Sequence, residues 1–231
     1  MKQFCEKIKR IPWWGYALGA GFFILQRIFY RLAEWLSQIL GTVNYAFECK
    51  IPFLDDPIKL IPAFVVIYIY SFVFWLCGPV AVSLTKKKNV VNFIAGMLIA
   101  YFIGFLFFVF MPTYMDRAAE GLKAGAEGPG IFKWLLRWIY SADGGDKAFN
   151  LFPSYHCLIS LYCYFGVRKQ PEISKGYQMY SLILTGLICL STLFTKQHYI
   201  VDVFGGLAIS LLVYIVVEKW NPGKKYEKIQ E

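Results

Sequence analysis

The chain contains two histidines, His156 and His198, and each lies at the start of an apolar segment. Histidine titrates near neutral pH, so it can transfer protons, and its imidazole can also be a covalent nucleophile. Asp202 follows His198 by four residues, which places both side chains on one face of a helix. Its carboxylate could accept the Nδ1 proton of His198 and leave Nε2 free to attack. A structural pair at a helix start would have the same spacing, but a carboxylate inside an apolar helix favours function.

The other histidine follows a helix start that suits an anion. Pro153 and Ser154 come directly before Tyr155 and His156, and serine is a favoured N-cap after a loop that ends in proline. The free backbone N–H groups of such a start attract phosphate. A histidine in the first turn could protonate a leaving oxygen, although a capped helix with an interfacial histidine would look the same.

Two cations lie where they could hold phosphate oxygens and the negative charge of a transition state. Arg117 comes shortly after an apolar segment that ends near Met111, and Lys196 comes two residues before His198. Either could instead be a surface cation of a loop.

Membrane-spanning helices must position these residues. Of the 231 residues, 58% are hydrophobic, the mean hydropathy is +0.48, and the apolar residues gather in long runs. Soluble domains are about 45–50% apolar, and about 20 apolar residues cross a bilayer core. We therefore predict one all-α polytopic domain over residues 1–231, with a separate amphipathic stretch at 31–41. Its six transmembrane helices are predicted at about 13–30, 62–84, 90–111, 154–167, 177–194 and 199–217.

The charge distribution predicts how this bundle is oriented. Both termini and the loops at 85–89 and 168–176 share one side, and they carry 14 basic and five acidic residues. The rest of the chain carries ten of each, so the whole net charge of +9 lies on that side. The positive-inside rule makes that side cytoplasmic, so the charge reflects topology and no nucleic-acid partner is expected. The first helix is predicted to be a signal anchor, and both histidines to face outside, at the plasma membrane.

Two long segments, at 41–61 and 112–153, then lie outside with the histidines. A loop of about 40 residues is more often functional than decorative, and irregular backbone at membrane depth must be buried or line a wet cavity. We expect the second segment to carry part of the site. Several polar side chains of these segments could contact a headgroup or order the loops: Asp55, Asp56, Asp143, Asp146 and Asn150.

These strings together resemble the type 2 phosphatidic acid phosphatase family. Its patterns are K-x6-R-P, P-S-G-H and S-R-x5-H-x3-D, and the similarity runs from Pro112 to Asp202. The resemblance implies that His198 attacks phosphorus to form a phosphohistidine, that Asp202 orients it and that His156 protonates the leaving group. It also implies that Arg117 and Ser154 hold phosphate oxygens.

The chain departs from the family patterns at several positions. Tyr155 replaces the glycine of P-S-G-H, Thr192 replaces the arginine of S-R, and Phe110 stands where the first motif has lysine. Two phosphate-binding cations are therefore missing, and Lys196 could substitute for one. A basic residue before the His-Tyr pair is similar to the inositol-phosphorylceramide and sphingomyelin synthase branch, so the acceptor could be water or a lipid alcohol.

We accordingly expect an enzyme that needs no metal or other cofactor, because no metal-ligand set and no C-x-x-C pair is visible. It is predicted to be a lipid-phosphate phosphatase with a phospholipid or polyprenyl phosphate as substrate, bound at His198, His156, Asp202, Arg117, Ser154, Lys196 and Tyr155. One alternative is a phosphotransferase that moves a phospho-headgroup to diacylglycerol or ceramide. Another is a lipid-binding or transport protein without catalysis.

Overall fold

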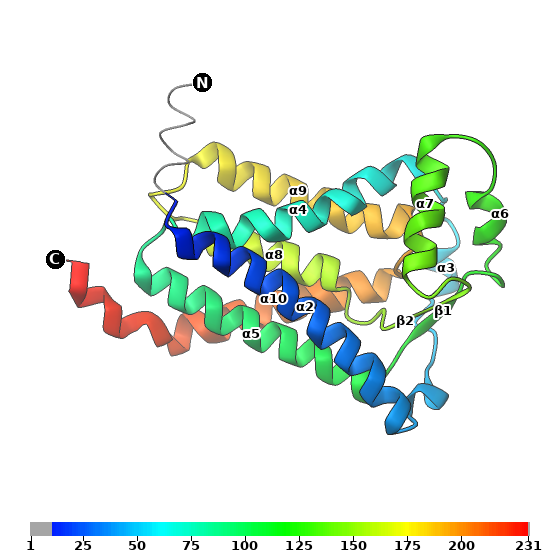
Figure 1. Cartoon of the computed structure of the whole chain (residues 1–231), viewed down its shortest axis with the longest axis horizontal. Helices are drawn as coiled ribbons and strands as arrows, with labels where there is room; N and C mark the ends of the chain where they lie inside the picture. The colour runs from blue at the N-terminus through cyan, green and yellow to red at the C-terminus, as the bar shows by residue number, and fades with distance from the viewer. Residues whose placement is uncertain (1–10, 231) are drawn as a thin grey trace.

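Long helices dominate the architecture, which a computed structural model describes for residues 11–230 (Figure 1). The basic start at 1–10 and Glu231, which entered the charge argument, lie outside the described residues. The six longest helices are α2 (Trp13–Ile39), α4 (Val65–Val82), α5 (Lys87–Phe110), α8 (Tyr155–Val167), α9 (Lys175–Phe194) and α10 (Ile200–Trp220). Shorter elements connect them: η1 (Thr42–Tyr45), α3 (Pro52–Asp55), η2 (Pro62–Phe64), α6 (Leu122–Ala126), α7 (Ile131–Ala142) and η3 (Pro222–Gln230).

The predicted apolar segments are all helical, and four of them are long and apolar enough to cross a membrane. These four cover Pro62–Val82, α5, α9 and α10. A mostly helical membrane protein is therefore supported, whereas the number of six spans stays a prediction. α8 has 13 residues, which is about 20 Å of helix against a hydrocarbon core of about 30 Å.

The first helix is longer than expected. We predicted that it ends near Tyr30 and that an amphipathic stretch follows separately, but α2 continues to Ile39 without a break. No proline or glycine interrupts this part of the sequence until Gly41, which adopts a left-handed conformation with φ of 70°. The charged residues near its middle therefore mark a polar face of one helix and do not mark its end.

The long segment after α5 is also more ordered than an all-α prediction allows. It contains a small antiparallel sheet of β1 (Tyr114–Asp116) and β2 (Lys147–Phe149), in which Tyr114 pairs with Phe149. Between the strands lies the amphipathic helix α7, whose Trp134 and Trp138 are exposed. Strands of three residues carry too little alternation for a sequence pattern to predict them.

α8 lies in the middle of the bundle and packs against α4, α9 and α10 (Figure 1). Ten of its 13 residues are buried, which explains why it is apolar on all sides. Figure 1 also shows that α2 and α4 lie together near the end of the molecule where the chain terminates and diverge towards the end that carries β1 and β2. The connections at 83–86 and 168–174 lie at the former end, and the segments at 40–64 and 111–154 lie at the latter.

The contact between α2 and α4 depends on a small residue. A Cβ atom on Gly19 would collide with the backbone carbonyl of Leu76, whereas a Cβ on Gly21 would meet no atom within 4 Å. Small residues let the backbones of membrane helices approach closely. We expect Gly19→Ala to lower the free energy of unfolding by about 1–3 kcal/mol through overpacking.

The matched control is Gly21→Ala on the same helix, which should be neutral or should stabilise by up to about 1 kcal/mol through helix propensity. Thermal unfolding of both variants in detergent micelles measures the difference. Equal melting temperatures would contradict the close approach of α2 and α4 at Gly19.

Candidate active site

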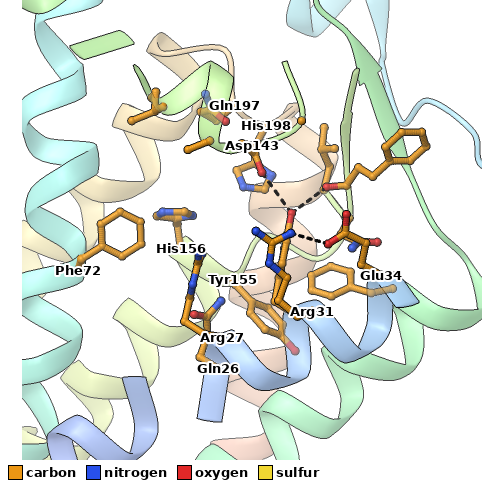
Figure 2. A pocket seen from close by; sticks show the side chains of 18 of the residues that line it. Gln26, Arg27, Arg31, Glu34, Phe72, Asp143, Tyr155, His156, Gln197 and His198 are labelled. Atoms are coloured by element: carbon orange, nitrogen blue, oxygen red, sulfur yellow. Dashed lines mark hydrogen bonds and ion pairs between the residues drawn. The ribbon is translucent and has the colours of Figure 1, made fainter. Parts of the chain in front are cut away.

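A cavity of about 500 Å³ opens at the end of the bundle that carries β1 and β2, and both histidines line it. Figure 2 shows His156 and His198 on one side of this cavity and residues of α2 on the other. The aromatic rings of Phe23, Tyr68, Phe72, Trp75 and Phe108 form much of the wall. The cavity therefore combines an apolar wall with a polar end, as an amphiphilic ligand would require.

The two histidines are brought together by a junction between the starts of α8 and α10. The backbone N–H of Ser154 donates to the carbonyl oxygen of Asp202 at 3.0 Å. The first N–H groups of a helix have no partner inside it, so this bond satisfies one across the junction. As a result, the ring centroids of His156 and His198 lie 6.0 Å apart, close enough for one bound group to contact both.

Asp202 lies beside His198 as its spacing predicts. Its Oδ2 is 3.5 Å from Nδ1 of His198, and the same oxygen accepts a 2.8 Å hydrogen bond from the backbone N–H of Tyr199. The carboxylate is fully buried in the first turn of α10, where the helix dipole favours negative charge. One carboxylate oxygen therefore caps the helix and also lies near the Nδ1 atom of His198. That Nδ1 atom has no hydrogen-bond partner among residues 11–230.

His156 is held by aromatic rings. Its ring stacks on Tyr68 at 4.2 Å between centroids and lies 4.8 Å from the ring of Trp75 and 5.6 Å from that of Phe72. Its Nε2 atom is buried without a hydrogen-bond partner in the described part of the chain. These contacts fix the plane of the imidazole and leave one nitrogen without a partner beside the cavity.

Ser154 and Tyr155 occupy the start of α8 in different ways. Ser154 is the N-cap residue, and its hydroxyl is buried and has no hydrogen-bond partner in the region that the structure describes. Tyr155 lines the cavity, but its hydroxyl donates to the carbonyl of Tyr101 at 2.7 Å. The serine is fully buried and does not line the cavity, so its predicted contact with a phosphate oxygen is not seen in this arrangement, whereas the tyrosine hydroxyl anchors α8 to α5.

The structure does not bring Arg117 into the cavity. Its guanidinium is fully buried and donates to the carbonyls of Tyr140, Asp143 and Gly145 at 2.9–3.2 Å. It also donates to the Asp143 carboxylate at 2.8 Å and to Oε1 of Gln197 at 2.9 Å. Arg117 therefore ties the outer segment to the residue before His198, and the expected contact with phosphate does not fit this placement.

Lys196 is likewise turned away from the cavity. Its backbone is left-handed, with φ of 51°, and its Nζ donates to the carbonyl oxygen of Asp55 at 3.0 Å. Partial burial lowers the pKa of the Lys196 ammonium, and the nearby charge of Glu120 opposes this effect. Lys196 thus connects the loop before α10 to the 41–61 segment. In this position it does not replace the phosphate-binding cation that the family patterns contain.

The acidic residues of the outer segments mostly order the loops. Asp55 accepts hydrogen bonds from the backbone N–H groups of Ile51 at 2.7 Å and Ile200 at 2.9 Å, so it joins the 41–61 segment to the start of α10. Asp56 pairs with Lys50 at 2.8 Å, and Asp146 pairs with Lys123. Asp143 and Asn150 also line the cavity, where Asp143 accepts a hydrogen bond from Tyr30 at 3.2 Å.

Sequence reasoning missed the contribution of α2. Gln26, Arg27, Arg31 and Glu34 all line the cavity, and the spacing of Arg27 and Arg31 puts them on one face of the helix. The available signal was a set of polar residues at 26–34, within the first predicted helix and in the amphipathic stretch after it. Within residues 11–230, no group of three His, Cys, Asp or Glu side chains could hold a metal ion.

Comparison with known proteins gives one match. A family model described as PAP2 superfamily matches residues 47–216, which include both histidines, Asp202 and Arg117. No curated protein and no solved structure matches the chain.

The placement of Arg117 predicts a structural role. Arg117→Gln should lower the free energy of unfolding by about 3 kcal/mol, because it leaves buried carbonyls and the Asp143 carboxylate without their partner. Arg137→Gln is the control, since Arg137 also donates to two backbone carbonyls but is only half-buried and pairs with no carboxylate among the described residues. Its effect should stay within about 0.5 kcal/mol.

Thermal denaturation in detergent, followed by tryptophan fluorescence, distinguishes the two variants. An Arg117→Gln protein that melts at the wild-type temperature would contradict the scaffold role, and a direct role in binding would then regain support.

Proposed function

The chain belongs to the PAP2 superfamily, and from that membership we propose that it is a membrane lipid-phosphate phosphatase that works through a covalent phosphohistidine. The superfamily comprises phosphatases and related phosphotransferases, so membership indicates phosphatase-type chemistry. The observation that carries the finer proposal is the pair of histidine rings, 6.0 Å apart, on one amphiphilic cavity.

In the first step, Nε2 of His198 attacks phosphorus and the bond from phosphorus to the lipid oxygen breaks. His156, in its protonated form, gives a proton to that oxygen, so the lipid leaves as an alcohol. Asp202, which lies 3.5 Å from Nδ1 of His198, stabilises the positive charge that the phosphorylated imidazole carries.

In the second step, a water molecule attacks the phosphohistidine. The bond between phosphorus and nitrogen breaks, neutral His156 takes a proton from the water, and inorganic phosphate leaves while both histidines return to their starting states. The free N–H groups at the start of α8 are suited to hold the phosphate oxygens through both steps. No step requires a metal ion.

The shape of the cavity supports a lipid as substrate. Its aromatic wall comes mainly from α2 and α4, the helices that diverge towards this end of the molecule (Figure 1). A phospholipid or polyprenyl phosphate could place its chain against that wall and its phosphate between the histidines. We propose that this end faces outside the plasma membrane, because the described basic loops lie at the other end.

A phosphotransferase is the second candidate. The observation that favours it is the enclosure of His156 by Tyr68, Phe72 and Trp75, since a dry site disfavours water as the attacking group. A lipid alcohol such as diacylglycerol or ceramide would then accept the phospho-headgroup.

Removal of either histidine should abolish turnover. We expect His198→Ala and His156→Ala to lower phosphate release from lipid phosphates by at least about 10³-fold, because each removes a group that forms or breaks a bond. The assay uses purified protein in detergent with phosphatidic acid, phosphatidylglycerol phosphate and polyprenyl diphosphate. Melting temperatures close to that of the wild type would show that the variants are folded, and retained activity in folded His198→Ala would refute the mechanism.

The acceptor is tested separately. For a phosphatase, phosphate release should proceed at the same rate, within about twofold, with or without added diacylglycerol or ceramide. Mass spectrometry of the lipid products gives the second readout. Turnover that requires the added lipid alcohol, and that yields a new phospholipid without inorganic phosphate, would establish the transferase instead.

A further inference from the structure

The cavity contains an arginine that forms no ion pair with the described residues. Arg27 of α2 lines the cavity together with His156 and His198, and Figure 2 shows its side chain extending from α2 towards His156. The other cations of the lining each have a carboxylate: Arg31 pairs with Glu34 at 2.9 Å, and Lys147 lies 3.7 Å from Asp116.

A second polar group beside Arg27 also points to a ligand. Gln26 lines the same cavity and is only 5% exposed, yet its Oε1 atom has no hydrogen-bond partner among the residues that the structure places. A buried amide oxygen without a partner costs about 1–3 kcal/mol unless a ligand or water satisfies it. The polar residues near the middle of α2 are therefore arranged for a group that the described part of the protein does not supply.

The cations expected to neutralise a phosphate are committed elsewhere. Arg117 is surrounded by carbonyls and Asp143, and Lys196 donates to Asp55, so neither lines the cavity. A doubly charged phosphate between the histidines would still require positive charge close to its oxygens. On α2, Arg27 offers a positive charge that no carboxylate of the described residues compensates.

We propose, on the basis of the phosphatase function above, that Arg27 is the principal phosphate-binding cation of this site and that Gln26 contributes a polar contact beside it. Phe23 lies one turn before Arg27 and also lines the cavity, so α2 presents first an apolar and then a charged surface along one face. This order fits an amphiphile with a terminal phosphate, whose chain contacts Phe23 while its phosphate contacts Arg27.

The competing explanation is that Arg27 extends along the helix to the membrane surface, as long cationic side chains of membrane helices do. Binding experiments separate the two explanations. The probe is dioleoyl phosphatidic acid, bound to the full chain carrying His198→Ala, which prevents turnover, with diacylglycerol as the probe without phosphate.

The test compares Arg27→Gln with the matched control Lys219→Gln, both in the His198→Ala chain. Lys219 lies in the last turn of α10 and does not line the cavity. We expect Arg27→Gln to weaken binding of phosphatidic acid by about 10- to 100-fold without changing binding of diacylglycerol, and Lys219→Gln to leave both unchanged. Equal phosphatidic acid affinity in the Arg27→Gln and control chains would overturn the proposal.

Arg27→Lys covers the case in which Arg27→Gln does not fold. Lysine retains the charge but not the planar fork that binds two phosphate oxygens, so a severalfold loss of affinity for phosphatidic acid alone is expected. Unchanged affinity would show that the guanidinium makes no specific contact with the phosphate and would overturn the proposal.

These outcomes are independent of the proposed function. If the wild type hydrolyses no lipid phosphate, the function fails, and the binding comparison still decides the role of Arg27. If the wild type is active but Arg27→Gln has normal KM and kcat, the function stands and the role of Arg27 fails.

Discussion

The hydrogen bond from the Ser154 N–H to the Asp202 carbonyl is the interaction on which the arrangement of the site depends. Gly206 permits it, because a Cβ atom there would collide with the Ser154 carbonyl oxygen. The bond sets the starts of α8 and α10 side by side. Carboxylates already cap the first N–H groups of α10, so the N–H groups that could bind an anion here belong to α8. His156 and His198 share one cavity because each belongs to one of these two starts.

The outer segments support that junction and leave little charge for a ligand. Asp55 caps the start of α10 from one side, and Arg117 holds Gln197 from the other. Both side chains are buried, and a buried charge needs such partners to be tolerated. Charge for a substrate must then come from a different element, and α2 supplies it.

The sequence predicts the local parts of this structure well. Hydropathy locates the helices, and the spacing of His198 and Asp202 predicts their contact, although His198 lies in the turn just before α10 and not within that helix. The direction of Arg117 and Lys196 was not predictable, since it depends on contacts with segments far along the chain. Arg27 was overlooked for a similar reason, because a charge in an apolar run does not reveal that other helices form a cavity beside it.

The shortness of α8 has a consequence for how a substrate is supplied. Its 13 residues cover about two thirds of the hydrocarbon thickness, so the helix start lies below the level of the headgroups if its other end lies at the opposite surface. Under the proposed function, a lipid would then reach the histidines by lateral diffusion in two dimensions, without being lifted into the aqueous phase. The rate would follow the mole fraction of the substrate in the leaflet and not its concentration in bulk solution.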